Sequence, residues 1–110
     1  MIKRNTIFVL FICLSTIINA QTFSIKGKLV SGSTAVDYAT VVLQNPDSSY
    51  VSGVVSDKNG RFRFDEMKEG DYRVVVSCIG YSDKIIALKL QNRNADLGDI
   101  ALDSITHQLK

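Results

Sequence analysis

Few side chains of this 110-residue chain have the types and spacing that chemistry at a site requires. Asp57 and Asn59, in the segment Asp57-Lys58-Asn59-Gly60, offer oxygen ligands of the kind that calcium binds. The further acids and the closing glutamate of a calcium loop do not follow at the required spacing. Because Asn-Gly supplies the positive φ angles of a tight turn, we interpret this segment as a hairpin turn and predict no metal site.

Nucleophilic catalysis would require Cys78 to lie beside a base that activates it. His107 is the single histidine, it lies in a tail after the last apolar segment, and metal or acid–base chemistry would need a second group held near it. Cys78 continues the alternation of Val74 and Val76, which predicts a small buried side chain. We therefore predict no catalytic, cofactor-binding or metal-binding residues, and no enzyme activity.

Carboxylates gather around the glycine-containing loop near residue 69, at Asp65, Glu66, Glu69 and Asp71. Two of them could form the carboxylate pair that glycoside hydrolysis uses. The loop composition instead indicates a solvated acidic turn.

Two tyrosines follow glycines and could stack on a ligand. For Tyr72, the alternation of its segment predicts a ring packed inside and a hydroxyl bonded to nearby backbone, as in the tyrosine corner of β-sandwiches. For Tyr81 we expect packing at the end of a sheet, with contact to a partner as the alternative.

The N-terminal segment indicates export. Lys3 and Arg4 precede an almost unbroken apolar run at residues 7–18, and the small residue Ala20 closes it. This order predicts that residues 1–20 form a secretory signal peptide, cleaved after Ala20.

Two other interpretations of this segment are open. An uncleaved anchor is disfavoured because the run is shorter than the roughly 20 apolar residues of a membrane span. A lipoprotein site at Cys13 is disfavoured because bulky Ile12 precedes the cysteine, inside the apolar run.

The charge of the chain comes from this leader. Residues 1–20 hold Lys3, Arg4 and no acid, so their removal takes the formal net charge from +2 to 0. The remaining chain offers no basic field for nucleic acid. It retains one cysteine and so forms no internal disulfide, which suits a bacterial envelope. We expect one small domain at residues 21–102 and a tail or linker at residues 103–110.

Apolar and polar residues alternate with a period of two after residue 20, and no segment shows a convincing helical period. The pattern predicts a single antiparallel seven-stranded β-sandwich, with Gly27 at a bulge or a close backbone approach and the strand from residue 72 at a central position. The expected strands are residues 23–29, 39–44, 50–56, 61–65, 72–78, 84–90 and 97–102.

The parity of each strand predicts which side chains face the core. They are Ile25, Leu29, Val41, Leu43, Phe62, Phe64, Tyr72, Val74 and Val76. The first strand and the strand at residues 84–90 are expected at sheet edges, because Lys26, Lys28, Lys84 and Lys89 lie on them and lysine discourages indiscriminate edge pairing.

Five short motifs in one order carry a family resemblance. They are Ile25-x-Gly27-x-Leu29, Ala39-Thr40-Val41-Val42-Leu43, Ser56-Asp57-Lys58-Asn59-Gly60-Arg61-Phe62-x-Phe64, Gly70-x-Tyr72-x-Val74-x-Val76 and Ile79-Gly80-Tyr81. Over about residues 23–102 the chain resembles the carboxypeptidase regulatory-like domain, which implies a transthyretin-like (prealbumin-like) β-sandwich. A Pro-hydrophobic-Gly step usual in that family is replaced here by residues 35–38, so we expect a differently built loop.

The motif that ends in Tyr81 resembles the version of this domain at the N-terminus of TonB-dependent outer-membrane receptors of Bacteroidetes-type bacteria. Residues 100–110 look like the segment that leads into a receptor's plug, and we expect no transport activity within these residues alone. The resemblance implies a non-catalytic accessory or interaction domain on the periplasmic side of the outer membrane or cell envelope. Its partner would be a protein or the adjoining plug and barrel, and membrane association would come only through a parent receptor or complex.

Two other functions are weighed against this one. A free-standing periplasmic or surface module for adhesion or carbohydrate binding would need exposed aromatic rings. The chain has no tryptophan, and most of its Phe and Tyr residues are expected to face inward. A transthyretin-like hydrolase would need a cluster of His with Arg or Lys, and the only histidine is in the tail. The nutrient, the partner and the oligomeric state stay open.

Overall fold

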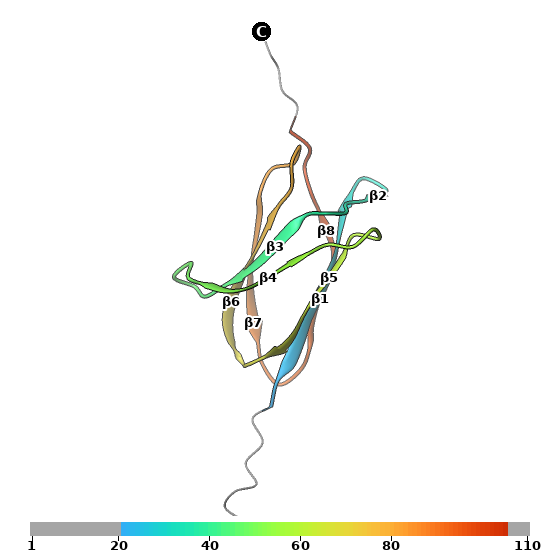
Figure 1. Cartoon of the computed structure of the whole chain (residues 1–110). Helices are drawn as coiled ribbons and strands as arrows, with labels where there is room; N and C mark the ends of the chain where they lie inside the picture. The colour runs from blue at the N-terminus through green and yellow to red at the C-terminus, as the bar shows by residue number, and fades with distance from the viewer. Residues whose placement is uncertain (1–20, 106–110) are drawn as a thin grey trace, which may run out of the picture.

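Two β-sheets pack face to face in the computed structural model, which describes residues 21–105 (Figure 1). No helix occurs among these residues, so none of them forms a helix long and apolar enough to cross a membrane. The strands are β1 (Phe23–Ser31), β2 (Thr34–Ala35), β3 (Thr40–Gln44), β4 (Tyr50–Val55), β5 (Arg61–Met67), β6 (Gly70–Ser77), β7 (Lys84–Leu90) and β8 (Ala95–Ala101). The predicted all-β sandwich is confirmed, with eight strands where seven were predicted, because the short β2 pairs with the end of β1.

The first sheet is organised around β1, which pairs with β5 on one side and with β8 on the other. The prediction that the first strand is an edge is therefore wrong. Lys26 and Lys28 alternate with the buried residues of β1 and point to the solvent face of the sheet, so they do not mark a free edge. The β1–β8 pair is also parallel, where an antiparallel arrangement was predicted.

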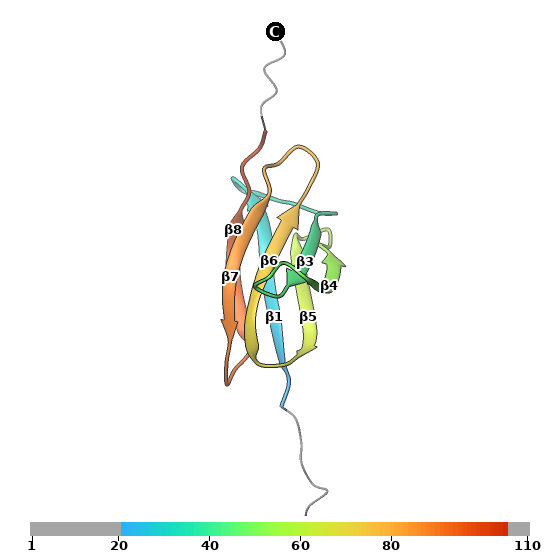
Figure 2. The ribbon, with the colours of Figure 1, turned by 90° about the vertical axis from the view of Figure 1, so that its left-hand side faces the viewer.

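The second sheet has the order β4-β3-β6-β7, and all its pairs are antiparallel (Figure 2). The predicted central position of the strand after Gly70 is confirmed, since β6 lies between β3 and β7. The predicted edge position of residues 84–90 is also confirmed, since β7 pairs only with β6 among the described residues.

The core lies between the two sheets and follows the predicted strand parity closely. Eight of the nine predicted core residues are buried, and the ninth, Tyr72, is half-buried against them. The sequence patterns missed five further buried side chains at loops and strand ends: Val36, Ala39, Leu90, Ile100 and Leu102.

Gly27 provides the space that one large core ring fills. It is the cross-strand partner of Phe62, and a Cβ atom on Gly27 would lie 2.8 Å from Phe62 Cζ and 3.2 Å from Ile100 Cδ1. Real Cβ atoms do not approach other atoms as closely as 2.8 Å. The Phe62 ring can therefore occupy this position only because residue 27 is a glycine and has no side chain. The pairing with β8 shifts register at this glycine, which agrees with the predicted bulge, and the close approach is made by side chains and not by another backbone.

The segment Ser56–Gly60 crosses from one sheet to the other. The sequence predicted a hairpin here and gave no sign of this crossing. The tight turn forms, with Gly60 at φ +78°, but β4 and β5 belong to different sheets and do not pair with each other. Turn chemistry specifies how sharply the chain reverses, and it does not specify whether the flanking strands pair. A Cβ on Gly60 would lie 2.4 Å from the carbonyl oxygen of Leu29, so no side chain fits where the crossing meets β1.

Ser56 holds the start of this crossing against the loop before β3. Its side chain is almost fully buried, donates a hydrogen bond to the carbonyl oxygen of Val36 and accepts one from the N–H of Ala39, both at 2.9 Å. Its own N–H donates to the carbonyl oxygen of Ala39, and its carbonyl accepts from the N–H of Tyr38. One hydroxyl thus satisfies two buried backbone groups in the loop where the chain departs from the family pattern.

Ser56→Ala is expected to destabilise the fold. The alanine would leave the N–H of Ala39 and the C=O of Val36 buried without that partner, at a cost on the order of 2 kcal/mol in the free energy of unfolding. Urea unfolding measures the change. Ser33→Ala, at an exposed position in the β1–β2 turn, serves as the control and should unfold at the parent's midpoint. Equal midpoints for the parent and Ser56→Ala would contradict this role.

Candidate functional site

The carboxylate of Asp57 holds the turn that was weighed as a calcium site. Its Oδ1 atom accepts hydrogen bonds from the N–H groups of Asn59 and Arg61, both at 2.9 Å. The N–H of Gly60 donates to the carbonyl oxygen of Asp57 at 2.8 Å, and this bond closes the turn. The turn interpretation is confirmed. Across residues 21–105, no group of three or more His, Cys, Asp or Glu side chains is placed to hold a metal ion.

These contacts lower the pKa of Asp57. The N–H of Arg61 contributes most, the N–H of Asn59 and the charges of Arg61 and Lys58 add to it, and desolvation acts in the opposite direction. Asp47 holds the β3–β4 turn in a similar way, and its pKa is lowered first by the hydroxyl of Ser49. Both shifted carboxylates among the described residues thus stabilise turns.

Tyr72 and Tyr81 pack as predicted, and Cys78 is less buried than predicted. Tyr72 packs against the core, and its hydroxyl donates to the carbonyl oxygen of Lys68 at 2.6 Å, which confirms the tyrosine-corner interpretation. Tyr81 is half-buried against the core at the end of the sandwich, where it forms an isolated bridge with Ser104. Cys78 also packs against the core but is half-buried, one residue beyond β6, where full burial was predicted.

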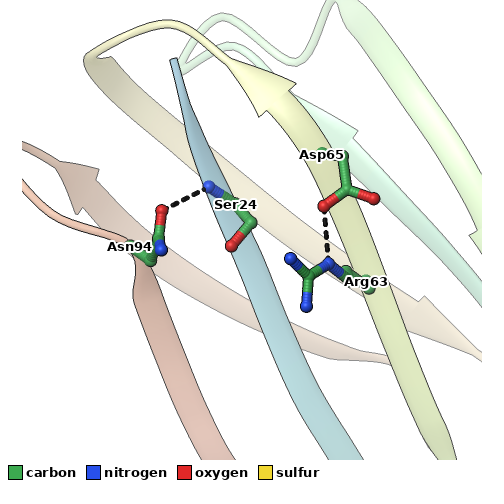
Figure 3. Close-up of polar contacts among 4 residues, drawn as sticks. All are labelled: Ser24, Arg63, Asp65 and Asn94. Carbon is green, nitrogen blue, oxygen red and sulfur yellow. Dashed lines mark hydrogen bonds and ion pairs between the residues drawn. The ribbon is translucent and has the colours of Figure 1, made fainter. Parts of the chain in front are cut away.

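The acidic loop is solvated, as predicted, and its carboxylates do not form a pair. Asp65 bonds to Arg63 within β5, as Figure 3 shows. Glu69 accepts a hydrogen bond from the N–H of Asn92 at 2.8 Å and so connects two loops at one end of the sandwich. Glu66 and Asp71 are exposed. The predicted signal peptide, with Cys13, and His107 lie outside the described residues.

One structural contact had no signal in the sequence. The N–H of Ser24 lies beside the register shift of the β1–β5 ladder between Phe23 and Ile25. The side chain of Asn94, just before β8, accepts a hydrogen bond from this N–H at 2.9 Å (Figure 3). Asn94 thereby adds a side-chain contact between β1 and the residue that precedes β8.

Charged side chains cover the solvent face of the first sheet in two cross-strand rows. One row is Asp96, Lys26 and Arg63, and the other is Asp99, Lys28 and Arg61. The Lys26 Nζ and Asp96 Oδ2 atoms lie 3.9 Å apart, and both side chains are exposed. An open groove runs over these rows and reaches Val54 and Val55 of β4. Within these two rows the side chains of β1 and β5 are basic and those of β8 are acidic.

The solvent face of the second sheet is mainly uncharged. Val42 and Val75 are directly paired and half-buried, and Ile85 is paired with Val75 at the β7 edge. Arg73 is the cation on this face in β6, and it donates to the hydroxyl of Ser48 in the β3–β4 loop. The two outer faces therefore offer different chemistry, one of charge rows and the other of apolar side chains.

Comparison with known proteins agrees with this architecture. The family model described as Carboxypeptidase regulatory-like domain matches residues 24–103. Serine-aspartate repeat-containing protein E of Staphylococcus aureus is 27% identical over 82 residues, which cover 74% of this chain and 7% of that protein. The chain thus spans a small part of the curated relatives that it matches.

Solved structures share the fold at low sequence identity. The major pilin subunit of Bacillus cereus is similar with a TM-score of 0.67 and 18% identity, over 77% of this chain and 31% of the pilin. The 5-hydroxyisourate hydrolase of Klebsiella pneumoniae is similar with a TM-score of 0.57 and 14% identity, over 72% and 90% of the two chains. Pilins and enzymes both use this sandwich, so these likenesses establish the fold alone.

The Asp57 turn is expected to make stability depend on pH in the acid range. Because its pKa is lowered on folding, its contribution is complete above the unfolded value of about 3.9 and is lost as the pH falls through the folded value. Asp57→Ala should therefore lower the melting temperature at about pH 7, and its difference from the parent should shrink by about pH 3.

Asp57→Asn separates the two contributions, because it keeps an acceptor oxygen and removes the charge. We expect its melting temperature at neutral pH to lie between those of the parent and Asp57→Ala. A difference between the parent and Asp57→Ala that is the same at both pH values would contradict the assigned role of the carboxylate.

Proposed function

Because the chain belongs to the carboxypeptidase regulatory-like domain family, we propose that it is a non-catalytic, exported domain that acts by contact with another protein. The observation that carries this proposal is the structural use of its polar groups. Asp57, Ser56 and Tyr72, which have the chemistry for a site, each bond to backbone of the domain itself. Its outer faces and free strand edges stay available for contact.

We further propose that the domain serves as the N-terminal extension of a TonB-dependent receptor for nutrient uptake, on the periplasmic side of the outer membrane. The support is the order of motifs ending in Tyr81 and the character of residues 103–110 as a linker. The described chain enters at one end of the sandwich and leaves at the other, which suits a domain placed in line within a longer protein (Figure 1). Ile105 donates to the carbonyl oxygen of Gly80 at 2.8 Å, so the exit is held to the body of the domain.

A free-standing surface module, for adhesion or carbohydrate binding, is the second candidate. The likeness to a serine-aspartate repeat-containing protein favours it. Two aromatic rings also lie outside the core, since Tyr38 is 83% exposed and Tyr50 is 69% exposed. In the first candidate function a receptor plug and barrel adjoin the domain, and in the second they do not. In both, the domain is exported and acts by contact with another molecule.

Deleting residues 23–102 in the producing bacterium, with the leader retained, tests the contact function. We expect the remaining protein to reach the envelope and to lose uptake or assembly with its partner. The measurements are the growth rate on limiting nutrient and the recovery of the complex by affinity purification.

A strain in which an unrelated β-sandwich of similar length replaces residues 23–102 is the matched control. It keeps the spacing and removes the specific surfaces, so it should be as defective as the deletion. Full uptake and normal complex formation in the replacement strain would show that the domain is a passive spacer. A defect in adhesion to surfaces, with normal uptake, would favour the second candidate.

A further inference from the structure

The described sandwich has four long strands at sheet edges, and three of them carry charged residues. Charged side chains and bulges on an edge discourage pairing with another chain. β5 holds Arg61, Arg63, Asp65 and Glu66; β7 holds Lys84 and Lys89; β8 holds Asp96 and Asp99 and shifts register against β1. β4, Tyr50–Val55, has no charged residue along its six positions.

The β4 edge presents both backbone groups and apolar side chains. Ser56 bonds towards the loop before β3 through its N–H and C=O, so the alternation of an antiparallel ladder directs the backbone groups of Val55 and Gly53 away from β3. Val55 is 55% exposed. The hydroxyl oxygen of Tyr50 lies 3.1 Å from where a Cβ of Gly53 would be, so this ring covers the glycine on the solvent face.

The space beside this edge has arginine side chains on its far side, with the carboxylate of Asp57 at the crossing between them and β4. The groove that touches Val54 and Val55 continues over Arg61 and Arg63 of β5, which is the edge strand of the opposite sheet. Arg63 bonds to Asp65. No ion pair involves Arg61 among the described residues, and its charge acts on the nearby carboxylate of Asp57, whose pKa it helps to lower. A strand paired with β4 would therefore have the apolar side chains of Val54 and Val55 on one side and the arginine side chains of β5 on the other.

We propose that the β4 edge accepts an extended strand of a partner protein that is apolar where it contacts β4 and carries carboxylates towards Arg61 and Arg63. Main-chain hydrogen bonds to Gly53 and Val55 would supply affinity, and the arginines would select an acidic segment. This assignment deepens the proposed contact function and rests on it.

A second copy of the chain fits this edge less well. Pairing β4 with β4 of another copy about a two-fold axis would bring the two β5 strands to the same side, with the arginines of each copy near those of the other. Like charges placed together oppose association. A partner strand with carboxylates avoids this conflict.

Two synthetic peptides test the assignment on the purified full chain. One alternates valine with glutamate over seven residues, and the other alternates valine with lysine. We expect the glutamate peptide to bind about ten-fold more tightly and to shift the backbone NMR signals of β4, with slower amide exchange at Gly53 and Val55. Equal affinities, no binding of either peptide at millimolar concentration, or shifts confined to β7 or β8 would overturn the proposal.

Val55→Glu and Ile85→Glu form a matched pair of variants, since the parent side chains are 55% and 54% exposed on the two edges of one sheet. Val55→Glu should weaken the glutamate peptide about ten-fold, and Ile85→Glu should leave it unchanged. Arg61→Gln with Arg63→Gln should remove the preference for glutamate over lysine and leave the fold intact, as circular dichroism would show.

Equal effects of the two glutamate variants would overturn the choice of β4. A dimer that forms without peptide and is dissociated by Val55→Glu would overturn the choice of a foreign strand in favour of a second copy. If the peptide binds elsewhere on the domain and the deletion strain still loses assembly with its partner, the assignment of the β4 edge is wrong and the proposed contact function is retained.

Discussion

The crossing between the two sheets at Ser56–Gly60 is the constraint on which the arrangement of this sandwich depends. Its start is held by the buried hydroxyl of Ser56, its turn by the carboxylate of Asp57, and its end by Gly60, which lies too close to Leu29 for any side chain. The N–H of Leu29 donates to the carbonyl oxygen of Gly60 at 2.7 Å, so the crossing is bonded directly to the central strand of the first sheet.

The same crossing determines what the domain offers to other molecules. It leaves β4 at the edge of one sheet and β5 at the edge of the other, with an uncharged strand beside arginine side chains. Domains of this size have thin cores, and here the polar groups at the turns mostly maintain the fold. Function by contact at an edge or a face requires no buried reactive group, so it is compatible with a core that consists mainly of apolar side chains.

Local patterns in the sequence predicted the parts of this structure that depend on local geometry. Strand parity places Phe62 and Phe64 inside because successive side chains in a strand point to opposite faces, whatever the strand pairs with. Pairing partners depend on long-range packing instead. A lysine such as Lys26 gives the same sequence pattern whether its strand lies at a sheet edge or in the centre with the lysine on the solvent face. The contact of Asn94 with Ser24 likewise forms only because β8 lies beside β1, which the local sequence does not show. The absence of charge in β4 was visible in the sequence, but its meaning required the knowledge that β4 is an edge.

Amide hydrogen exchange along β4 in the free chain tests the central claim most directly. The account predicts fast exchange at Gly53 and Val55, whose N–H groups point away from β3, and slow exchange at Val54 and Ser56, whose N–H groups point towards it. Alternation between fast and slow amides would show a strand that is bonded on one side and open on the other. Uniformly slow exchange from residue 51 to residue 56 would show that this edge is already covered, and it would contradict the account.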